Sequence, residues 1–142
     1  MTDLIFTCTT STLSTYLALN GYTAYRYRYD ASFPTTTIFP NAGAYHGSEN
    51  SEVFGTYQLS NQFGTATPQQ IQLSAFMQNV WANFTKNADA GVGWPKIGSA
   101  FGLELGVFGA SESSGVTVKS TMVADYPCGL YIGLANALNL SY

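Results

Sequence analysis

The single histidine of this chain, His46, is the residue best suited to proton transfer. It lies in the segment Gly43-Ala44-Tyr45-His46-Gly47-Ser48-Glu49, where glycines on both sides let the backbone bend and leave the imidazole accessible. Imidazole takes up and releases a proton near neutral pH, and rigid scaffolds commonly present such groups on loops. A lone loop histidine is more often a solvated or packing residue than a catalytic one. The residues around His46 are therefore needed to distinguish these roles.

The composition of the 142-residue chain excludes several other functions. The length fits one domain, and 46% hydrophobic residues are enough for a core. Only 9% of the residues are charged, which suits either a secreted protein or a piece that docks against more protein. With a net charge of −3 and five Lys and Arg, the chain has no basic patch for a phosphate backbone, so we expect no nucleic-acid binding. One histidine and two distant cysteines argue against a metal site.

Membrane and targeting signals are also absent from the sequence. No run reaches the roughly 20 apolar residues that span a bilayer, so we expect no membrane span. The N-terminus has no basic start, since the first arginine is Arg26, and a secreted parent would carry its signal upstream of this sequence.

The first half of the chain predicts a helix, a strand and a long loop. Residues 3–20 have helical spacing, with Thr2 or Asp3 as the cap and Gly21 after the end. The expected inner stripe of this helix is Ile5, Cys8, Thr12, Tyr16 and Leu19. Residues 23–29 alternate tyrosine with arginine and predict a strand, and residues 30–45, rich in Pro, Thr and Gly, form a loop that leads to His46.

The second half predicts a long helix, a hairpin and a final helix. Residues 67–86 begin with an N-cap, a proline at the first helical position and a glutamine at the third. The apolar stripe that we expect to pack against the sheet is Leu73, Phe76, Met77, Val80, Trp81 and Phe84. Residues 103–108 and 116–119 predict two short strands joined by a Gly-Ser-rich turn, and residues 121–138 predict a helix interrupted by Pro127 and Gly129.

The residues that follow His46 resemble the catalytic-histidine segment of the type-B carboxylesterases, the cholinesterase and lipase family. The family spacing is histidine, glycine, an acid three positions on, and then Val-Phe-Gly, and His46-Gly47-Ser48-Glu49 with Glu52-Val53-Phe54-Gly55 matches it. Residues 25–34 resemble the last core strand and the loop after it, residues 81–86 resemble the family's Trp-x-x-Phe-x-Lys helix, and residues 93–95 resemble its Trp-Pro step. The ordered set covers essentially the whole chain.

The resemblance implies an α/β-hydrolase fold, of which residues 1–142 would be the incomplete C-terminal part. The implied order is helix, last core strand, His loop, helix, short β-hairpin and C-terminal helix. The family hydrolyses carboxylic esters with a Ser, Glu or Asp, His triad and no cofactor, and His46 would be the general base and general acid. The partners implied are an ester substrate in the intact parent and the missing N-terminal portion of the hydrolase.

The rest of the triad machinery does not appear in the sequence. The nearest match to Gly-x-Ser-x-Gly is Gly109-Ala110-Ser111-Glu112-Ser113, which ends in serine, follows His46 and lies in a predicted turn. Among the acids, only Asp3 and Asp30 precede His46, and neither lies in the family's acid motif. We therefore expect the isolated chain to be inactive, since it can form no acyl-enzyme.

Several smaller expectations follow from the same segments. Cholinesterase-like members bridge the positions of Cys8 and Cys128, which implies a disulfide and a secreted protein. Glu49 and Ser48 are expected to cap a short helix over residues 48–54, while Glu52 departs from a family position that is often apolar. The candidate N-glycosylation sites are Asn139, near the terminus, and the less favoured Asn83, in mid-helix.

Two alternatives stay open on the sequence alone. The first is a non-catalytic binding or regulatory module derived from the esterase fold, which would expose a polar surface. The second is an independent small α+β protein, which would unfold cooperatively without a partner.

Overall fold

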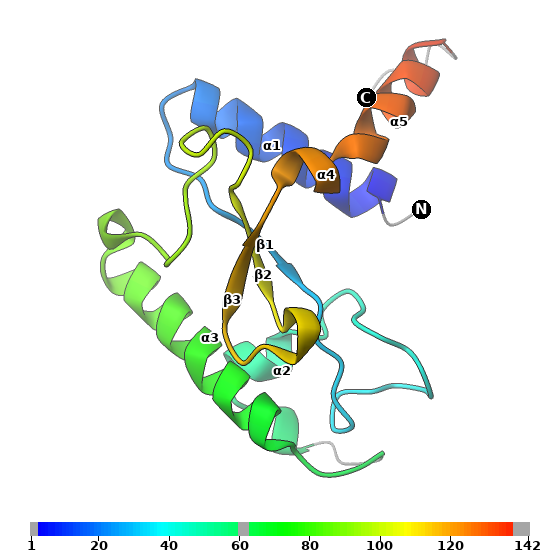
Figure 1. Cartoon of the computed structure of the whole chain (residues 1–142), viewed down its shortest axis with the longest axis vertical. Coiled ribbons are helices and arrows are strands. Elements are labelled where there is room, and N and C mark those ends of the chain that lie inside the picture. Colours follow the sequence, from blue (N-terminus) through cyan, green and yellow to red (C-terminus); the bar gives the residue numbers. More distant parts are fainter. Residues whose placement is uncertain (1–2, 60–62, 138–142) are drawn as a thin grey trace. The chain divides into compact units, whose positions relative to one another are not determined.

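The computed structural model describes residues 3–59 and 63–137 (Figure 1). The chain divides into two compact units. Of the described residues, 3–26, 95–105 and 119–137 belong to the first unit, and 27–59, 63–94 and 106–118 belong to the second. No helix within the described ranges is long and apolar enough to cross a membrane.

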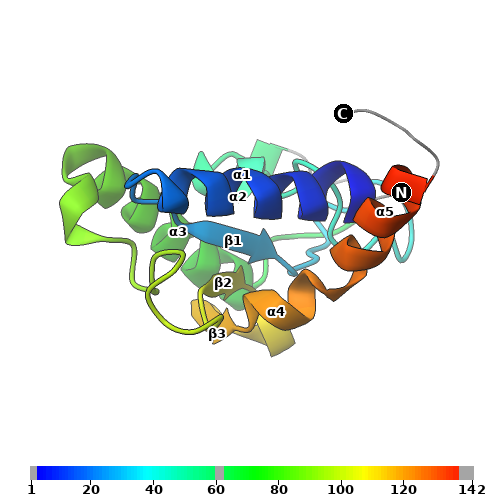
Figure 2. The same cartoon turned by 90° about the horizontal axis from the view of Figure 1, so that it is seen from above.

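The first unit is built from the helices at the two ends of the sequence. A π-helical turn, η1 (Asp3–Thr7), continues into α1 (Cys8–Leu19), which confirms the helix predicted over residues 3–20. The predicted final helix is two helices, α4 (Thr121–Ala124) and α5 (Tyr126–Ala137), with the break at Asp125. The interruption predicted at Pro127 and Gly129 is wrong, because both residues lie in the first turn of α5, where a proline needs no helical N–H partner. Figure 2 shows α5 beside the N-terminal end of α1, where a disulfide joins Cys8 to Cys128 with Cα atoms 5.3 Å apart.

The inner stripe predicted for α1 is wrong, apart from Cys8. Ile5, Thr12, Tyr16 and Leu19 are all exposed, and the second buried residue of the helix is Ser14. The disulfide turns Cys8 inward, and one turn later the Ser11 hydroxyl donates to Asp125 Oδ2 at 2.7 Å. The inward face of α1 therefore carries small and polar side chains. The disulfide and the Ser11–Asp125 hydrogen bond set which face of the helix turns inward, and the scattered apolar residues do not.

Asp125 is also the partner of Arg26, the one arginine of this unit. The Arg26 guanidinium donates to both carboxylate oxygens of Asp125, at 2.6 and 2.8 Å, in a bidentate pair. Arg26 is 6% exposed, so the pair is largely shielded from water. This pair and the disulfide tie the C-terminal helices to the N-terminal segment.

A three-stranded sheet has the order β1-β2-β3, with strands β1 (Arg26–Tyr29), β2 (Leu105–Phe108) and β3 (Val116–Lys119). The first residues of β1 and β2 and the last residue of β3 belong to the first unit, and the other strand residues belong to the second. The predicted hairpin is confirmed, and the strand predicted over residues 23–29 is shorter than expected. The link between β2 and β3 contains a single 3-10 turn, η4 (Ala110–Glu112).

The core of the second unit is an aromatic cluster around Phe108, which is fully buried. Four rings contact Phe108 with centroids 5.5 to 6.0 Å away: Tyr27, Phe76, Trp81 and Trp94. Gly106 makes this packing possible, because a Cβ atom there would lie 2.7 Å from the Trp94 ring.

Helix α3 (Pro68–Lys86) supplies two of these rings, which confirms the predicted packing of this helix on the sheet. Its N-cap is also confirmed, since the Thr67 hydroxyl accepts the Gln70 N–H at 3.1 Å. Leu73 and Met77 are fully buried, whereas Phe84 is 40% exposed and does not belong to the core. The shorter elements of the unit are α2 (Asn50–Val53), η2 (Tyr57–Leu59) and η3 (Ala88–Ala90).

Candidate functional site

His46 is exposed on a turn between the long loop and α2, as the sequence predicts. The turn reverses the chain through Gly47, whose φ of +85° is a conformation that other residues adopt only with strain. Ser48 N–H donates to Tyr45 O at 3.0 Å, and Asn50 N–H donates to Gly47 O at 3.1 Å. The imidazole is therefore presented at the surface by a hydrogen-bonded backbone.

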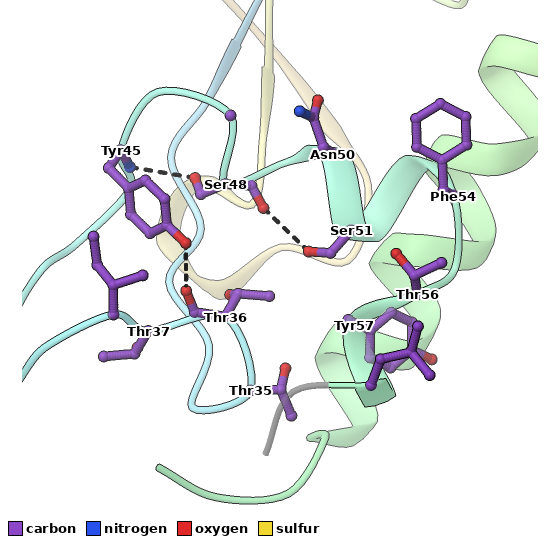
Figure 3. Close-up of a pocket in the computed structure, with 13 residues that line it drawn as sticks. Thr35, Thr36, Thr37, Tyr45, Ser48, Asn50, Ser51, Phe54, Thr56 and Tyr57 are labelled. Atoms are coloured by element: carbon purple, nitrogen blue, oxygen red, sulfur yellow. Dashed lines mark hydrogen bonds between the residues drawn. The ribbon is translucent and has the colours of Figure 1, made fainter. Parts of the chain in front are cut away.

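Side chains around the turn brace it further (Figure 3). Ser48 Oγ accepts the Tyr45 N–H at 3.2 Å, and the Tyr45 hydroxyl donates to Thr36 O at 2.7 Å. The cap predicted at Ser48 is wrong, because its hydroxyl bonds back to Tyr45 instead of capping α2. Tyr45 thus links the turn to the loop that precedes it.

Glu49 does not cap α2 through its side chain either. Its carboxylate accepts a hydrogen bond from the Tyr27 hydroxyl at 3.2 Å. Burial, together with the charge of Glu49 and this hydrogen bond, raises the pKa of Tyr27 to about 12. Tyr27 therefore keeps its proton at physiological pH, and Glu49 connects the turn to β1.

Glu52, which departs from the family pattern, is completely buried. Its Oε1 accepts from Gln70 Nε2 at 2.8 Å, and its backbone carbonyl accepts from the Ser74 hydroxyl at 2.7 Å. Burial raises the pKa of Glu52 to about 7, although the hydrogen bond from Gln70 opposes the rise. The carboxyl group is thus partly protonated near neutral pH.

Gln70 donates a second hydrogen bond from the same Nε2 atom, to Thr35 Oγ1 at 2.6 Å. We call this arrangement of Thr35, Gln70 and Glu52 the Gln70 bridge. The sequence placed Gln70 at the third position of the helix as part of its start signal, but the Gln70 side chain bonds Thr35 and Glu52, while Thr67 alone provides the side-chain cap. The sequence signal for this bridge was Glu52, which stands at a position that is often apolar in the family. The partners of Glu52 could not be predicted from the sequence.

A cavity of about 500 Å³ adjoins the His46 turn. Its described lining residues combine hydroxyl and amide side chains with Ile38, Phe54 and Leu59, and none of them is charged. Several of its hydroxyl groups are already bonded within the protein, as at Tyr45, Ser48 and Thr37. The wall of the cavity is therefore a preformed, uncharged surface (Figure 3).

The acids that precede His46 in sequence and the serine of the Gly-x-Ser-like match are bonded or placed elsewhere in the structure. Asp30 forms a bidentate pair with Arg28, with both distances 2.7 Å, and Asp3 lies in η1 of the first unit. Ser111 lies in η4, with a φ of 50°, and lines a separate cavity together with Asp30. His46 does not line that cavity.

The predicted modification sites have different outcomes. The bond between Cys8 and Cys128 is present in the structure. Asn83 is exposed near the C-terminal end of α3, and its glycosylation stays a prediction. Asn139 lies outside the described residues. The described residues include no cluster of three or more His, Cys, Asp or Glu side chains that would hold a metal.

Comparisons with known proteins identify the family to which this chain belongs. The model of the carboxylesterase family matches residues 1–104, and the chain belongs to this family. The family implies an α/β-hydrolase fold, with which the helices and the small mixed sheet are consistent.

Two similar proteins are fungal. "Secreted lipase 5" of Gibberella zeae is 34% identical over 95 residues, which are 65% of this chain and 17% of the lipase. "Chlorogenic acid esterase" of Aspergillus niger is 33% identical over 73 residues, which are 51% of this chain and 14% of the esterase. The matched segments are thus less than a fifth of the length of either relative.

Proposed function

We propose that this chain supplies the catalytic histidine of a serine-dependent carboxylic ester hydrolase, and that His46 is that histidine. The observation that carries the proposal is an exposed His46 on a hydrogen-bonded turn, in a segment that resembles the family's catalytic-histidine motif and lies within the residues that the family model matches. Membership of the carboxylesterase family supports ester hydrolysis as the reaction class. A packing role fits poorly with the exposure of the ring.

In this reaction His46 moves one proton in each direction. The imidazole accepts the serine proton as the serine oxygen bonds to the ester carbonyl carbon, and the carbonyl π electrons move to its oxygen. When the tetrahedral intermediate collapses, the C–O bond to the alcohol breaks and the imidazolium gives that proton to the leaving oxygen. Water then repeats the sequence and releases the acid. Imidazole suits both steps because its ordinary pKa lies near neutrality.

We propose that the serine, the triad acid and the oxyanion donors come from polypeptide beyond the 142 residues. In this proposal residues 1–142 form the C-terminal part of a carboxylesterase domain. The support is the order of the triad in α/β-hydrolases, Ser before acid before His, together with the much greater length of the relatives.

Exposed apolar side chains of the first unit favour this proposal over a self-contained binding module. Such a module would present a polar surface, whereas large apolar residues here are more than half exposed. On the N-terminal and C-terminal helices these residues are Leu13, Tyr16, Leu19, Met122, Val123, Tyr126 and Leu130.

The cavity that adjoins the His46 turn, which His46 itself does not line, favours an uncharged ester as the substrate. None of the described residues that line the cavity is charged, so an ionised group placed there would lose hydration without gaining a charged partner among them. The relatives named as a secreted lipase and a chlorogenic acid esterase indicate lipase substrates and chlorogenic acid as the esters to assay. Chlorogenic acid has a free carboxylate, so its turnover tests the preference for uncharged esters. The disulfide and the relative named as secreted support an extracellular location.

A serine-reactive fluorophosphonate probe tests where the nucleophile lies. We expect no stoichiometric labelling of the purified chain, because the strained serine of η4, Ser111, has no role in the proposal. The matched control is the Ser111→Ala variant. Stoichiometric labelling of the natural chain that is lost in Ser111→Ala would contradict the proposal.

A further inference from the structure

The two segments that flank His46 are tied to the same helix by one side chain. Gln70 of α3 donates from Nε2 to Thr35, in the loop before His46, and to Glu52, in the helix after it. The donor–acceptor distances are 2.6 and 2.8 Å. One amide group therefore closes the loop that carries the imidazole.

The bridge is shielded from water on all sides. Gln70 and Glu52 have no exposed surface, and Thr35 is 2% exposed. Buried hydrogen bonds are costly to break, because a separated donor or acceptor has no water to replace its partner. Ser74, one turn further along α3, adds a bond to the backbone carbonyl of Glu52 at 2.7 Å.

The bonds within the turn cannot replace the bridge. Tyr45 and Ser48 fix the shape of the turn itself and its link to Thr36. They do not attach it to α3, and residues 30–45 contain no helix or strand that would do so. The Tyr27 hydroxyl ties Glu49 to β1 on one side of the turn, and the attachment of the turn to α3 depends on Gln70 and Ser74.

We propose that Gln70 is a positioning residue for His46, and that its amide bridge keeps the imidazole in a single orientation for proton transfer. The functional part of this inference rests on the proposed role of His46. The structural part, that the bridge orders the turn, does not. Gln70 itself contacts neither a reacting atom nor His46 in this inference, and acts through Thr35 and Glu52.

The test uses the fact that the chain has one histidine. Labelling with ¹⁵N and ¹³C gives a single imidazole signal set, and amide hydrogen exchange reports the opening of the turn at Ser48 and Asn50. In Gln70→Ala we expect exchange at these two amides to rise at least about tenfold and the imidazole signals to shift.

Three further variants separate positioning from general stability. Gln72→Ala removes an exposed glutamine from the same helix and should leave both readouts unchanged. Glu52→Gln keeps an Oε1 acceptor for Gln70 and should preserve the wild-type signals. Thr35→Val removes only the arm before His46, and should shift the imidazole signals even if Gln70→Ala fails to fold.

Unchanged exchange and imidazole signals in Gln70→Ala and Thr35→Val, relative to Gln72→Ala, would overturn the inference. A fall in melting temperature with no change in the imidazole signals would also overturn it, since the bridge would then be merely structural. The proposed function fails in a different measurement, the hydrolytic activity of a His46 variant. The two failures are therefore distinguishable.

Discussion

Each unit of this chain buries a glutamate, and the pKa values of these two glutamates shift in opposite directions. In the first unit Glu104 is 5% exposed, and burial alone would raise its pKa, but backbone N–H groups around it lower the pKa below its usual value. The donors belong to residues 98–100 and 102, with Ala100 at 2.8 Å. In the second unit Glu52 has only the Gln70 amide for its carboxyl oxygens, and burial raises its pKa to about 7.

The same contrast extends to what stabilises each unit. The first unit depends on point attachments, the Cys8–Cys128 disulfide and the Arg26–Asp125 pair, and leaves large apolar side chains exposed. The second unit depends on a buried core around Phe108, with Leu73 and Met77 also fully buried. The lesson is that the unit carrying His46 has its own packed core, while the other unit relies on cross-links.

The largest effect expected is the loss of the disulfide. The sequence separation of Cys8 and Cys128 is 120 residues, and closing a loop of that size lowers the entropy of the unfolded chain. In the chain-entropy model this contributes roughly 4–5 kcal/mol. In the double variant Cys8→Ser and Cys128→Ser, denaturant titration should show that loss, with amide exchange rising first in α1 and α5. Equal increases in α1, α5 and α3 would remove the contrast between the units.

A smaller effect is expected from the titration of Glu52. Its carboxyl is protonated in both states below pH 4.5, and between pH 4.5 and about 7 only the unfolded chain releases the proton. Stability should therefore fall by roughly 3 kcal/mol as pH rises through that window and then level off. The charge of Glu52 also acts on Tyr29 of β1, whose pKa is raised mainly by burial and secondly by Glu52.

The matched control for this titration is Glu52→Gln, which cannot ionise. Melting temperatures measured from pH 4 to pH 8 should lose the corresponding slope in this variant, while the contributions of other groups remain. An identical slope in wild type and variant would mean that Glu52 has an ordinary pKa.

The smallest effect, with the opposite sign, is expected from Glu104. Because its pKa is lowered on folding, its contribution is present above the unfolded-chain value and is lost as pH falls through the folded value. Glu104→Gln should cost about 1–2 kcal/mol at pH 7, since backbone donors lose a charged acceptor. Urea titrations at pH 7 and pH 3 should show this cost shrinking on acidification. A cost that grows at pH 3 would contradict the assignment.

Local signals in the sequence predicted the elements of the second unit well. Thr67 and Pro68 predict the start of α3 through cap chemistry, which depends on residues within one turn. The exposed position of His46 on a turn was predicted from the glycines beside it. Its catalytic role was implied by family resemblance, and only the family itself is established.

Features that depend on distant partners could not be predicted. The inner face of α1 is set by Asp125 and Cys128, more than a hundred positions away in sequence. Gln70 fitted the local start signal of the helix, and nothing near it in sequence indicates that its side chain bonds Thr35 and Glu52. A local motif indicates which hydrogen bonds a side chain can make. Which of them forms depends on the residues that the tertiary fold brings near it.

The central claim is that His46 moves the proton in ester hydrolysis. It is tested most directly in a chimera in which residues 1–104, the segment matched by the family model, replace the corresponding segment of the Gibberella zeae lipase. Initial rates on uncharged esters are then compared for the chimera, His46→Gln and the control Gln72→Ala. We predict that His46→Gln lowers kcat by at least about a thousandfold, while Gln72→Ala does not change it. Equal rates for His46→Gln and an active parent chimera would contradict the claim.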